Sequence, residues 1–279
     1  MFGKLVPVPS GAVIPERDIG KRPILNCINL GVTFGGLKAV DDFNLMIGRT
    51  EIAGLIGPNG AGKTTVFNLL TKVYQPTHGT ILLDGQDTHN MTTAQVNRAG
   101  IARTFQNIRL FNDLTVEENV TVAMDAQMKY NMVSGIFRLP SFWKEEKVAH
   151  ERALELLSLF HMEDLANVKA GSLPYGAQRR LEIVRALATN PSLLLLDEPA
   201  AGMNPSETAE LMENILKIRD TFQIAIMLIE HDMKLVMGIC EGIAVLNYGS
   251  IIAKGTPEQI QSNPAVIEAY LGKKKEAEV

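Results

Sequence analysis

The segment GPNGAGKT, residues 57–64, constrains the fold more than any other stretch of this chain. It matches the pattern G-x-x-x-x-G-K-[ST] between a compact strand predicted over 51–56 and a helix predicted over 64–74. In that setting, glycines let backbone N–H groups curl around phosphate oxygens, and the positive end of the helix dipole adds attraction. A glycine turn with a chance lysine is the alternative, and the strand–loop–helix order argues against it. The segment therefore predicts a nucleotide site.

Two side chains of this segment carry most of its chemistry. Lys63 is expected to reach the β- and γ-phosphates, and the Thr64 hydroxyl can hold Mg²⁺. The predicted nucleotide-binding residues of the loop and the helix start are Gly57, Pro58, Asn59, Gly60, Ala61, Gly62, Lys63, Thr64 and Thr65.

Composition places the chain among ordinary globular proteins. Its 279 residues suffice for one large α/β domain or two small ones. Hydrophobic residues make up 46% and charged residues 21%, which excludes a wholly disordered chain, and the net charge of −4 argues against nucleic-acid binding. Cys27 and Cys240 lie far apart without metal-ligand spacing, which indicates reduced thiols in a cytosolic protein. No apolar run approaches the ~18 residues that cross a bilayer, and residues 1–22 lack the apolar core of a signal peptide.

Strand-like and helical runs alternate along the chain, which predicts an α/β fold. Residues 116–189 show helical periodicity, broken over 128–142, and are interpreted as a helical subdomain inserted in the α/β core. The apolar runs 193–196 and 224–229 fit parallel strands covered on both faces. The remaining strands are expected over 24–30, 43–47, 80–83, 243–246 and 251–253, the last two as a hairpin around Tyr248 and Gly249.

A pair of carboxylates follows the strand predicted over 193–196. Because ligands in open α/β sheets gather at the carboxyl ends of strands, Asp197 and Glu198 are expected near the phosphates. Asp197 would bind Mg²⁺, directly or through water, and Glu198 would polarise the attacking water. A strand with an ordinary acidic surface end is the alternative.

These segments together resemble ATP-binding cassette (ABC) ATPases over roughly residues 22–272. The resemblance extends to Gln106 in RTFQNIRLF, His231 in LIEHDMKL and Phe34 in VTFGG. It implies that Gln106 is a Mg²⁺ ligand in the glutamine loop, that His231 contacts the γ-phosphate, and that Phe34 stacks on the adenine of ATP. A capped loop histidine and a core phenylalanine are the ordinary alternatives, and the order of the motifs makes the resemblance specific. The implied catalytic residues are therefore Glu198, Gln106 and His231.

A closer resemblance is to the ATPase subunits of branched-chain (hydrophobic) amino acid importers. It is carried by RTFQNIRLFNDLTVEENV, LPYGAQRRLEI, LDEPAAGMNP, IEHDMKLVMGIC and GTPEQIQSNPAVIEAYLG. The resemblance implies two ATPase subunits, identical or related, on two membrane permease subunits, with an external binding protein that supplies the substrate. The chain would then lie at the cytoplasmic, inner face of the cell membrane.

The resemblance also implies the fold and its boundaries. We expect an α/β P-loop NTPase with a RecA-like core, an N-terminal antiparallel β subdomain and an inserted helical subdomain. An extended segment, 1–22, would precede an ABC ATPase domain over 23–272, and a solvated tail, 273–279, would follow it. Within that domain the core would cover 23–106 and 191–272, and the helical subdomain about 107–190.

The signature segment, Leu173–Ala177, reads LPYGA where the wider family carries LSGGQ. In the family this segment faces the γ-phosphate held by the other subunit, so Leu173, Tyr175, Gly176 and Ala177 are implied nucleotide contacts. Pro174 has neither hydroxyl nor N–H, but it suits the first position of a helix predicted over 176–188. Gly176 is expected to face the partner's nucleotide, and Ser172 could replace the missing serine. The alternative is a helix start that packs only within its own subunit.

Two further segments concern coupling. Asn204 stands where the family usually has aspartate, in a loop implied to run along the dimer interface. Ile108, Leu110 and Phe111 follow Gln106, and Thr115 with Glu118 predicts a capping box, in a region where the resemblance implies permease docking. Core packing of Leu110 and Phe111 is the alternative.

Other functions stay open at this stage. The same ATPase could serve another substrate, such as a lipid or lipopolysaccharide. A cassette of DNA repair would carry a long coiled coil and one of translation a tandem copy, and neither is present in the sequence. A role in iron–sulfur assembly is harder to exclude. The sequence leaves open which amino acid is carried, whether the partner subunit is identical, and what residues 1–22 do.

Overall fold

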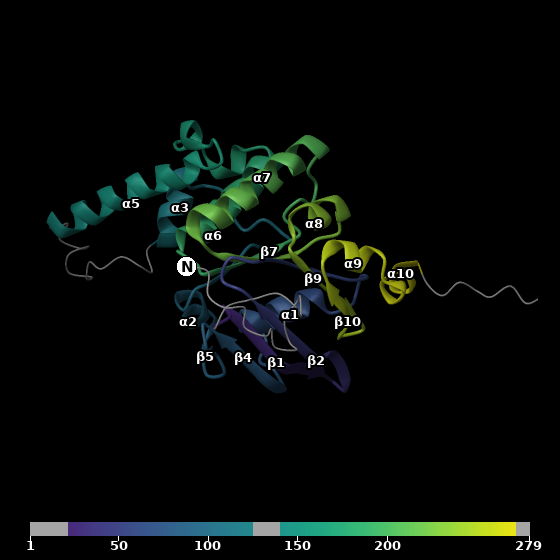
Figure 1. Ribbon diagram of the computed structural model, residues 1–279. Helices are drawn as coiled ribbons and strands as arrows, with labels where there is room; N and C mark the ends of the chain where they lie inside the picture. Colours follow the sequence, from purple (N-terminus) through teal and green to yellow (C-terminus); the bar gives the residue numbers. More distant parts are fainter. Residues whose placement is uncertain (1–21, 125–139, 272–279) are drawn as a thin grey trace, which may run out of the picture.

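A computed structural model describes residues 22–124 and 140–271 of the chain, and the side chains of 140 and 141 are not among them (Figure 1). The predicted segment 1–22, apart from its last residue, and the predicted tail 273–279 lie outside this part. Most of the predicted helix break, 128–142, also lies outside it.

The described residues form two sheets and two groups of helices. The strands are β1 Leu25–Phe34, β2 Leu37–Ile47, β3 Ile52–Ile56, β4 His78–Leu83, β5 Gln86–Asp87, β6 Ile101–Arg103, β7 Leu193–Asp197, β8 Ala225–Ile229, β9 Gly242–Asn247 and β10 Ser250–Gly255. The helices are α1 Lys63–Leu70, α2 Thr93–Arg98, α3 Val116–Met124, α5 Pro140–Ser158, α6 Tyr175–Ala188, α7 Pro205–Phe222, α8 Met233–Ile239, α9 Pro257–Gln261 and α10 Pro264–Leu271, with short 3₁₀ turns at Glu163–Leu165 and Ala170–Ser172.

The larger sheet has six strands in the order β10-β9-β3-β8-β7-β6. β6, β7, β8, β3 and β9 pair in parallel, and β10 closes one edge as an antiparallel hairpin with β9. The apolar run of β7 is covered on both faces, because Leu193 and Leu195 join one core cluster while Leu194 and Leu196 join the other. A continuous apolar strand is the expected consequence of burial on two sides.

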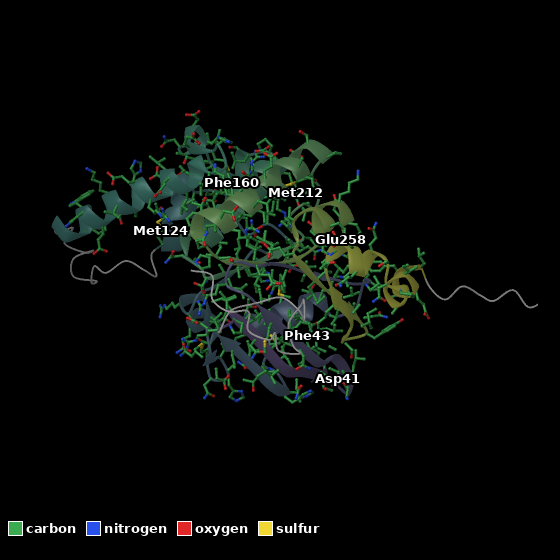
Figure 2. All side chains as sticks on the ribbon, in the orientation of Figure 1. Asp41, Phe43, Met124, Phe160, Met212 and Glu258 are labelled. Carbon is green, nitrogen blue, oxygen red and sulfur yellow. The ribbon has the colours of Figure 1, made fainter. Side chains whose placement is uncertain are left out.

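The smaller sheet is antiparallel, with the order β2-β1-β4-β5. It lies below the larger sheet in Figure 1, with α1 between them. Phe43 of β2, labelled in the lower part of Figure 2, shares a core cluster with Phe67 of α1 and Leu195 of β7. This layer is the predicted N-terminal antiparallel subdomain, and the predicted fold class is confirmed.

On the opposite side of the larger sheet, α3, α5, α6 and α7 form a helical layer (Figure 1). Phe160, labelled there in Figure 2, packs in the second core cluster together with residues from these helices. The predicted capping box is confirmed, because Thr115 N donates to Glu118 Oε2 at 2.7 Å and Glu118 N donates to Thr115 Oγ1 at 3.1 Å. Over the described ranges, no helix combines the length and the hydropathy needed to span a bilayer.

Some local predictions were wrong. The helix predicted over 64–74 ends at Leu70, because Lys72 adopts a φ of +57° and the chain turns there. Val73 is therefore 51% exposed and does not extend the apolar face of α1. β6 and the long helix α7 were not predicted at all. The hairpin around Tyr248 and Gly249 is confirmed, with both turn residues at positive φ, as a tight primed turn requires.

Candidate functional site

The phosphate loop joins the end of β3 to the start of α1, and glycines are required at two of its positions. Gly57 has a φ of +151°, and a Cβ there would lie 2.0 Å from the carbonyl oxygen of Leu246. Gly62, the N-cap of α1, has a φ of +105°, and its Cβ would lie 2.7 Å from the oxygen of Ala39. The loop is thus pressed against β2 and β9, and its first-turn amides point outward from the N-terminus of α1.

Lys63 is folded back into this loop. Its Nζ donates to the carbonyl oxygens of Gly57, at 2.7 Å, and Pro58, at 3.0 Å. Burial lowers the pKa of Lys63, and the nearby carboxylates of Glu198 and Asp197 act in the opposite direction. Both carbonyl partners are neutral, so phosphate oxygens, which carry charge, would be stronger partners for the ammonium.

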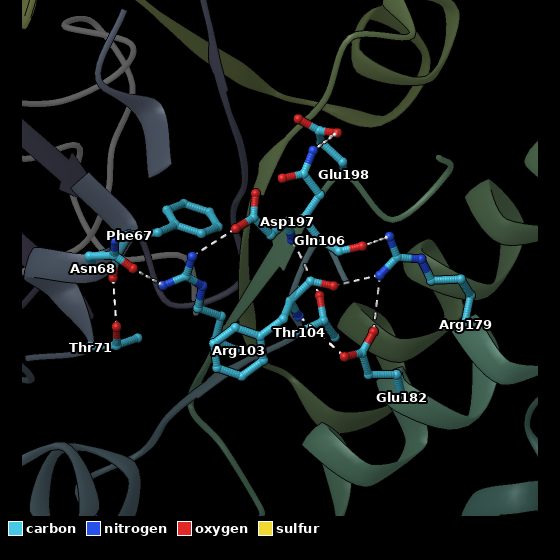
Figure 3. Close-up of polar contacts among 11 residues, drawn as sticks. Phe67, Asn68, Thr71, Arg103, Thr104, Gln106, Arg179, Glu182, Asp197 and Glu198 are labelled. Atoms are coloured by element: carbon cyan, nitrogen blue, oxygen red, sulfur yellow. Dashed lines mark hydrogen bonds and ion pairs between the residues drawn. The ribbon is translucent and has the colours of Figure 1, made fainter. Parts of the chain in front are cut away.

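The three predicted catalytic residues meet at one carboxylate. Glu198 follows β7 at a φ of +50°, and its backbone N–H donates to Ile229 O at 2.9 Å. Glu198 Oε2 accepts from Gln106 Nε2 at 2.9 Å, and Oε1 lies 3.1 Å from His231 Nε2 (Figure 3 shows the first contact). A residue from the loop after β6, one from the end of β7 and one from the loop after β8 therefore converge. This geometry suits a group that orients a water molecule.

Asp197 is held by a partner that the sequence did not predict. Its carboxylate pairs with Arg103 Nη2 at 2.7 Å, and both side chains are buried (Figure 3). Arg103 Nη1 donates to Asn68 Oδ1 of α1 at 2.7 Å, and Thr104 Oγ1 accepts the N–H of Asp197 at 3.3 Å. Arg103 lies on β6, the strand that was missed. The only sequence signal was its place three residues before Gln106.

The oxygen donors here fit Mg²⁺. Thr64 and Gln106 are exposed, and the ion pair of Asp197 uses Oδ2, so Oδ1 is the oxygen left for a metal. Hydroxyl, amide and carboxylate oxygens are the hard ligands that Mg²⁺ prefers, usually with only a few protein ligands besides phosphates and water. The set of donors therefore suits a metal that is also bound by the phosphates of a nucleotide. Within 22–124 and 140–271, no group of three or more His, Cys, Asp or Glu side chains could hold a metal.

Phe34 ends β1 and is 44% exposed. Its ring makes an edge contact with Tyr74, with the ring centroids 5.1 Å apart. Ala39 of the following strand abuts Gly62 of the phosphate loop. An exposed aromatic pair thus belongs to the hairpin beside the loop, and adenine stacking on Phe34 stays a prediction.

The signature segment is mostly turned inward. Leu173, Gly176 and Ala177 are buried, and Tyr175 is 47% exposed. Pro174 is the N-cap of α6, because the helix begins at Tyr175, one residue earlier than predicted. A Cβ at Gly176 would lie 2.9 Å from Oε1 of Glu207 in the same subunit. The groups that remain outward are Pro174, the ring of Tyr175 and the first-turn amides of α6.

The structure also shows which hydrogen bonds Ser172 and Asn204 make. The Ser172 hydroxyl donates to Lys169 O at 2.7 Å, so it is used within its own turn. Asn204 caps α7, since its Oδ1 accepts from the N–H groups of Ser206 and Glu207 at 2.9 and 3.0 Å. The loss of the family aspartate therefore leaves a working helix cap.

Glu230 is a second residue that was missed. Its buried carboxylate accepts from Ala200 N at 2.7 Å and from His231 N at 2.9 Å. It ties the loop after the carboxylates to the loop of His231. Its position directly before His231 was the only sequence signal.

Comparison with known proteins agrees with this geometry. The family model described as ABC transporter matches residues 40–201. The chain belongs to the ABC transporter family. It is 51% identical over 251 residues to the high-affinity branched-chain amino acid transport ATP-binding protein LivG of Escherichia coli K12, covering 90% of this chain and 98% of that protein. It is 49% identical over 251 residues to the protein of the same description, BraF, of Pseudomonas aeruginosa, with the same coverage. The resemblance seen in the sequence is confirmed, and the chain is an ABC ATPase.

The C-terminal part and the fold of this ABC ATPase also have matches. A second family model, described as branched-chain amino acid ATP-binding cassette transporter, matches residues 250–276. Among solved structures, the ADP conformation of the cassette MJ1267 superposes with a TM-score of 0.78 at 30% identity, covering 90% of this chain and 99% of that one. The dimeric cassette MJ0796 gives a TM-score of 0.71 at 26% identity, covering 84% and 98%.

Proposed function

We propose that this ABC ATPase powers the uptake of branched-chain or other hydrophobic amino acids across a membrane. The observation that carries the proposal is the identity of about half of 251 residues to two relatives whose names state branched-chain amino acid transport. The match of residues 250–276 to a model of the same description supports it independently of the nucleotide site.

In the proposed cycle, ATP phosphates occupy the loop 57–65, and Lys63 exchanges its two carbonyl partners for phosphate oxygens. Thr64, Gln106 and Asp197 would hold Mg²⁺, which neutralises charge on the β- and γ-phosphates when bound. Phe34 would stack on the adenine. Glu198 then orients and deprotonates a water, with His231 directed at the γ-phosphate.

We also propose that each ATP is completed by a second ATPase subunit, identical or related. The MJ0796 cassette, whose fold matches this one, has been solved as a dimer. The partner's signature segment, with Leu173, Tyr175, Gly176 and Ala177, would close the site. Since Gly176 is buried against Glu207, the amides at the start of α6 and Tyr175 would make the contacts. ATP would therefore bring the two subunits together.

The further partners proposed are two membrane permease subunits and, indirectly, an external binding protein. The chain would lie at the cytoplasmic face of the cell membrane. A second candidate cargo has one observation in its favour: the chain is 32% identical over 249 residues to the lipopolysaccharide export system ATP-binding protein LptB of Haemophilus influenzae. The higher identity to LivG and BraF favours amino acids.

The test is purification of the tagged chain from membranes together with its permease, followed by reconstitution in liposomes with the binding protein. We expect ATP hydrolysis to rise with leucine, isoleucine or valine, and labelled leucine to accumulate only with ATP on the side of the ATPase. A complex that carries Glu198→Gln is the control and should not accumulate leucine. Stimulation by lipopolysaccharide without any response to amino acids would contradict the proposed substrate class.

A further inference from the structure

Helix α6 carries a buried ion pair that plays no direct part in the chemistry above. Arg179 Nη1 contacts Glu182 Oε2 at 3.0 Å, and the two side chains are only 2% and 6% exposed (Figure 3). Removing two charges from water costs free energy that their attraction does not always return. The other hydrogen bonds that Arg179 and Glu182 make therefore explain the burial of the pair better than their mutual attraction does.

The pair binds the backbone of the glutamine loop from one side. Arg179 Nη1 donates to Phe105 O at 2.5 Å, and Nη2 donates to Gln106 O. Glu182 Oε1 accepts from the N–H groups of Phe105 and Arg109, at 3.4 Å each. Donors and acceptors of the loop are thus both bound by α6. The loop position that results is the one from which the Gln106 side chain reaches Glu198.

The same arginine also contacts the start of α6. The Arg179 guanidinium lies 5.8 Å from the centre of the Tyr175 ring. That ring packs on the loop after the carboxylates, since a Cβ at Gly202 would lie 3.0 Å from its Cε1. Tyr175 and Pro174 are the exposed residues of the signature segment, and Tyr175 carries the larger side chain. Arg179 therefore links the glutamine loop to Tyr175 of the signature segment, and the Tyr175 ring in turn contacts the loop around Gly202.

We propose that Arg179 is a positioning residue that couples the two ATP sites of the dimer. Within one subunit, Gln106 belongs to the subunit's own site, and the start of α6 belongs to the site of its partner. This inference rests on the proposed two-subunit arrangement. A movement of the glutamine loop when ATP binds would pass through the guanidinium to Tyr175, so that hydrolysis at the two sites becomes cooperative. The planar fork of arginine is suited to bind two adjacent carbonyls at once, which an ammonium does not reproduce.

The decisive variant is Arg179→Lys, which keeps the charge opposite Glu182 and loses the fork. The matched control is Arg152→Lys, which changes another arginine paired with a glutamate three residues on, Glu155, at an exposed site on α5. ATP affinity, kcat and the Hill coefficient of ATP hydrolysis are measured on the full-length chain. We expect unchanged affinity, a kcat lowered about fivefold, at the lower end of the usual range of coupling effects, and a Hill coefficient that falls toward 1. The control should keep all three values.

A lysine variant with normal kcat and normal cooperativity, or a wild-type Hill coefficient of 1, would overturn the coupling. Amide hydrogen exchange of the wild-type chain gives a readout that needs no variant. ATP should slow exchange in 105–109 and 174–178 together, and protection of one segment alone would also overturn it. If the wild-type chain forms no ATP-dependent dimer, either with itself or with a related ATPase subunit that purifies with it, the proposed two-subunit arrangement itself fails. If ATP-dependent dimers form but the two ATP sites do not act cooperatively, only the proposed role of Arg179 is rejected, and the two-subunit arrangement stands.

Discussion

The two halves of the proposed ATP site are built in different ways. In the phosphate-loop half-site, residues 57–65, the backbone packs against β2 and β9, but the Lys63 side chain is held by two carbonyl contacts that a ligand can replace. The signature half-site, residues 173–177, is held by packing, with Leu173 and Ala177 buried and Gly176 against Glu207. In the proposed cycle, Lys63 of the first half would exchange its internal partners for phosphates, whereas the second half would present a surface whose shape is fixed by packing before ATP binds. We therefore expect mutations in the first half to act on binding or chemistry, and mutations in the second to act on turnover.

The largest effect is expected at Glu198, the carboxylate proposed to activate water at the completed ATP site. Glu198→Gln removes the base while its Gln106 and His231 neighbours remain, so kcat should fall by about 10² to 10⁴ and ATP binding should persist. Phosphate release measures the loss, and gel filtration with ATP should show a stalled dimer. Glu213→Gln, on the exposed side of α7, serves as the control. Full hydrolysis by the Glu198 variant would remove this residue from its role.

Lys63→Ala tests the phosphate-loop half-site. A charge-assisted contact to phosphate is worth about 1.5–3 kcal/mol, so ATP affinity should weaken about 10- to 100-fold. Titration calorimetry with ATP and Mg²⁺ measures the dissociation constant. Lys217→Ala, on an exposed part of α7, should bind normally. Unchanged affinity in the Lys63 variant would mean that the lysine keeps its carbonyl partners when ATP is bound.

Tyr175→Ala tests the signature half-site. The ring contacts Gly202 and lies near Arg179, and a cation–π contact is worth about 0.5–1 kcal/mol at an exposed site and about 2 kcal/mol when desolvated. We expect kcat to fall about two- to tenfold with the ATP affinity of the single subunit unchanged. Tyr175→Phe keeps the ring and should restore turnover. A loss of affinity in place of turnover would erase the distinction between the half-sites. Gly176→Glu is a poorer test, because its side chain would meet Glu207 in its own subunit.

The smallest effect is expected at Asn204, next to the signature half-site. Asn204→Ala removes the cap of α7 and should lower the free energy of unfolding by about 1 kcal/mol. Asn204→Asp keeps the capping acceptor, so its stability should match that of the wild type in thermal unfolding. Equal stability of the alanine variant would show that the cap contributes nothing.

The difference between the half-sites also explains what was predictable. The phosphate loop and the place of Lys63 in it were predictable because a strand, a tight loop and a helix start are local features, although the close approach of Leu246 and Ala39 to Gly57 and Gly62 is seen only in the structure. From the sequence, packing of the signature segment within its own subunit was only an alternative, because this packing depends on the helical core and, at Gly176, on Glu207 of α7, a helix that was itself not predicted. The C-terminal end of α1 was also predicted wrongly, since a single positive φ at Lys72 ended a helix whose apolar pattern continued in the sequence.

By itself, the sequence determined the family, the α/β fold and the identity of the groups expected to bind phosphate, because these follow from motif order and local backbone chemistry. Only the tertiary structure decided which long-range partners those groups have: Arg103 on Asp197, Glu230 between two loops, and Arg179 on the glutamine loop. These contacts join residues from 30 positions apart, in the pair Ala200–Glu230, to 94 positions apart, in the pair Arg103–Asp197. Such separations carry no periodic signal, since partners far apart in the chain meet only when the sheet order and the helix packing bring them together.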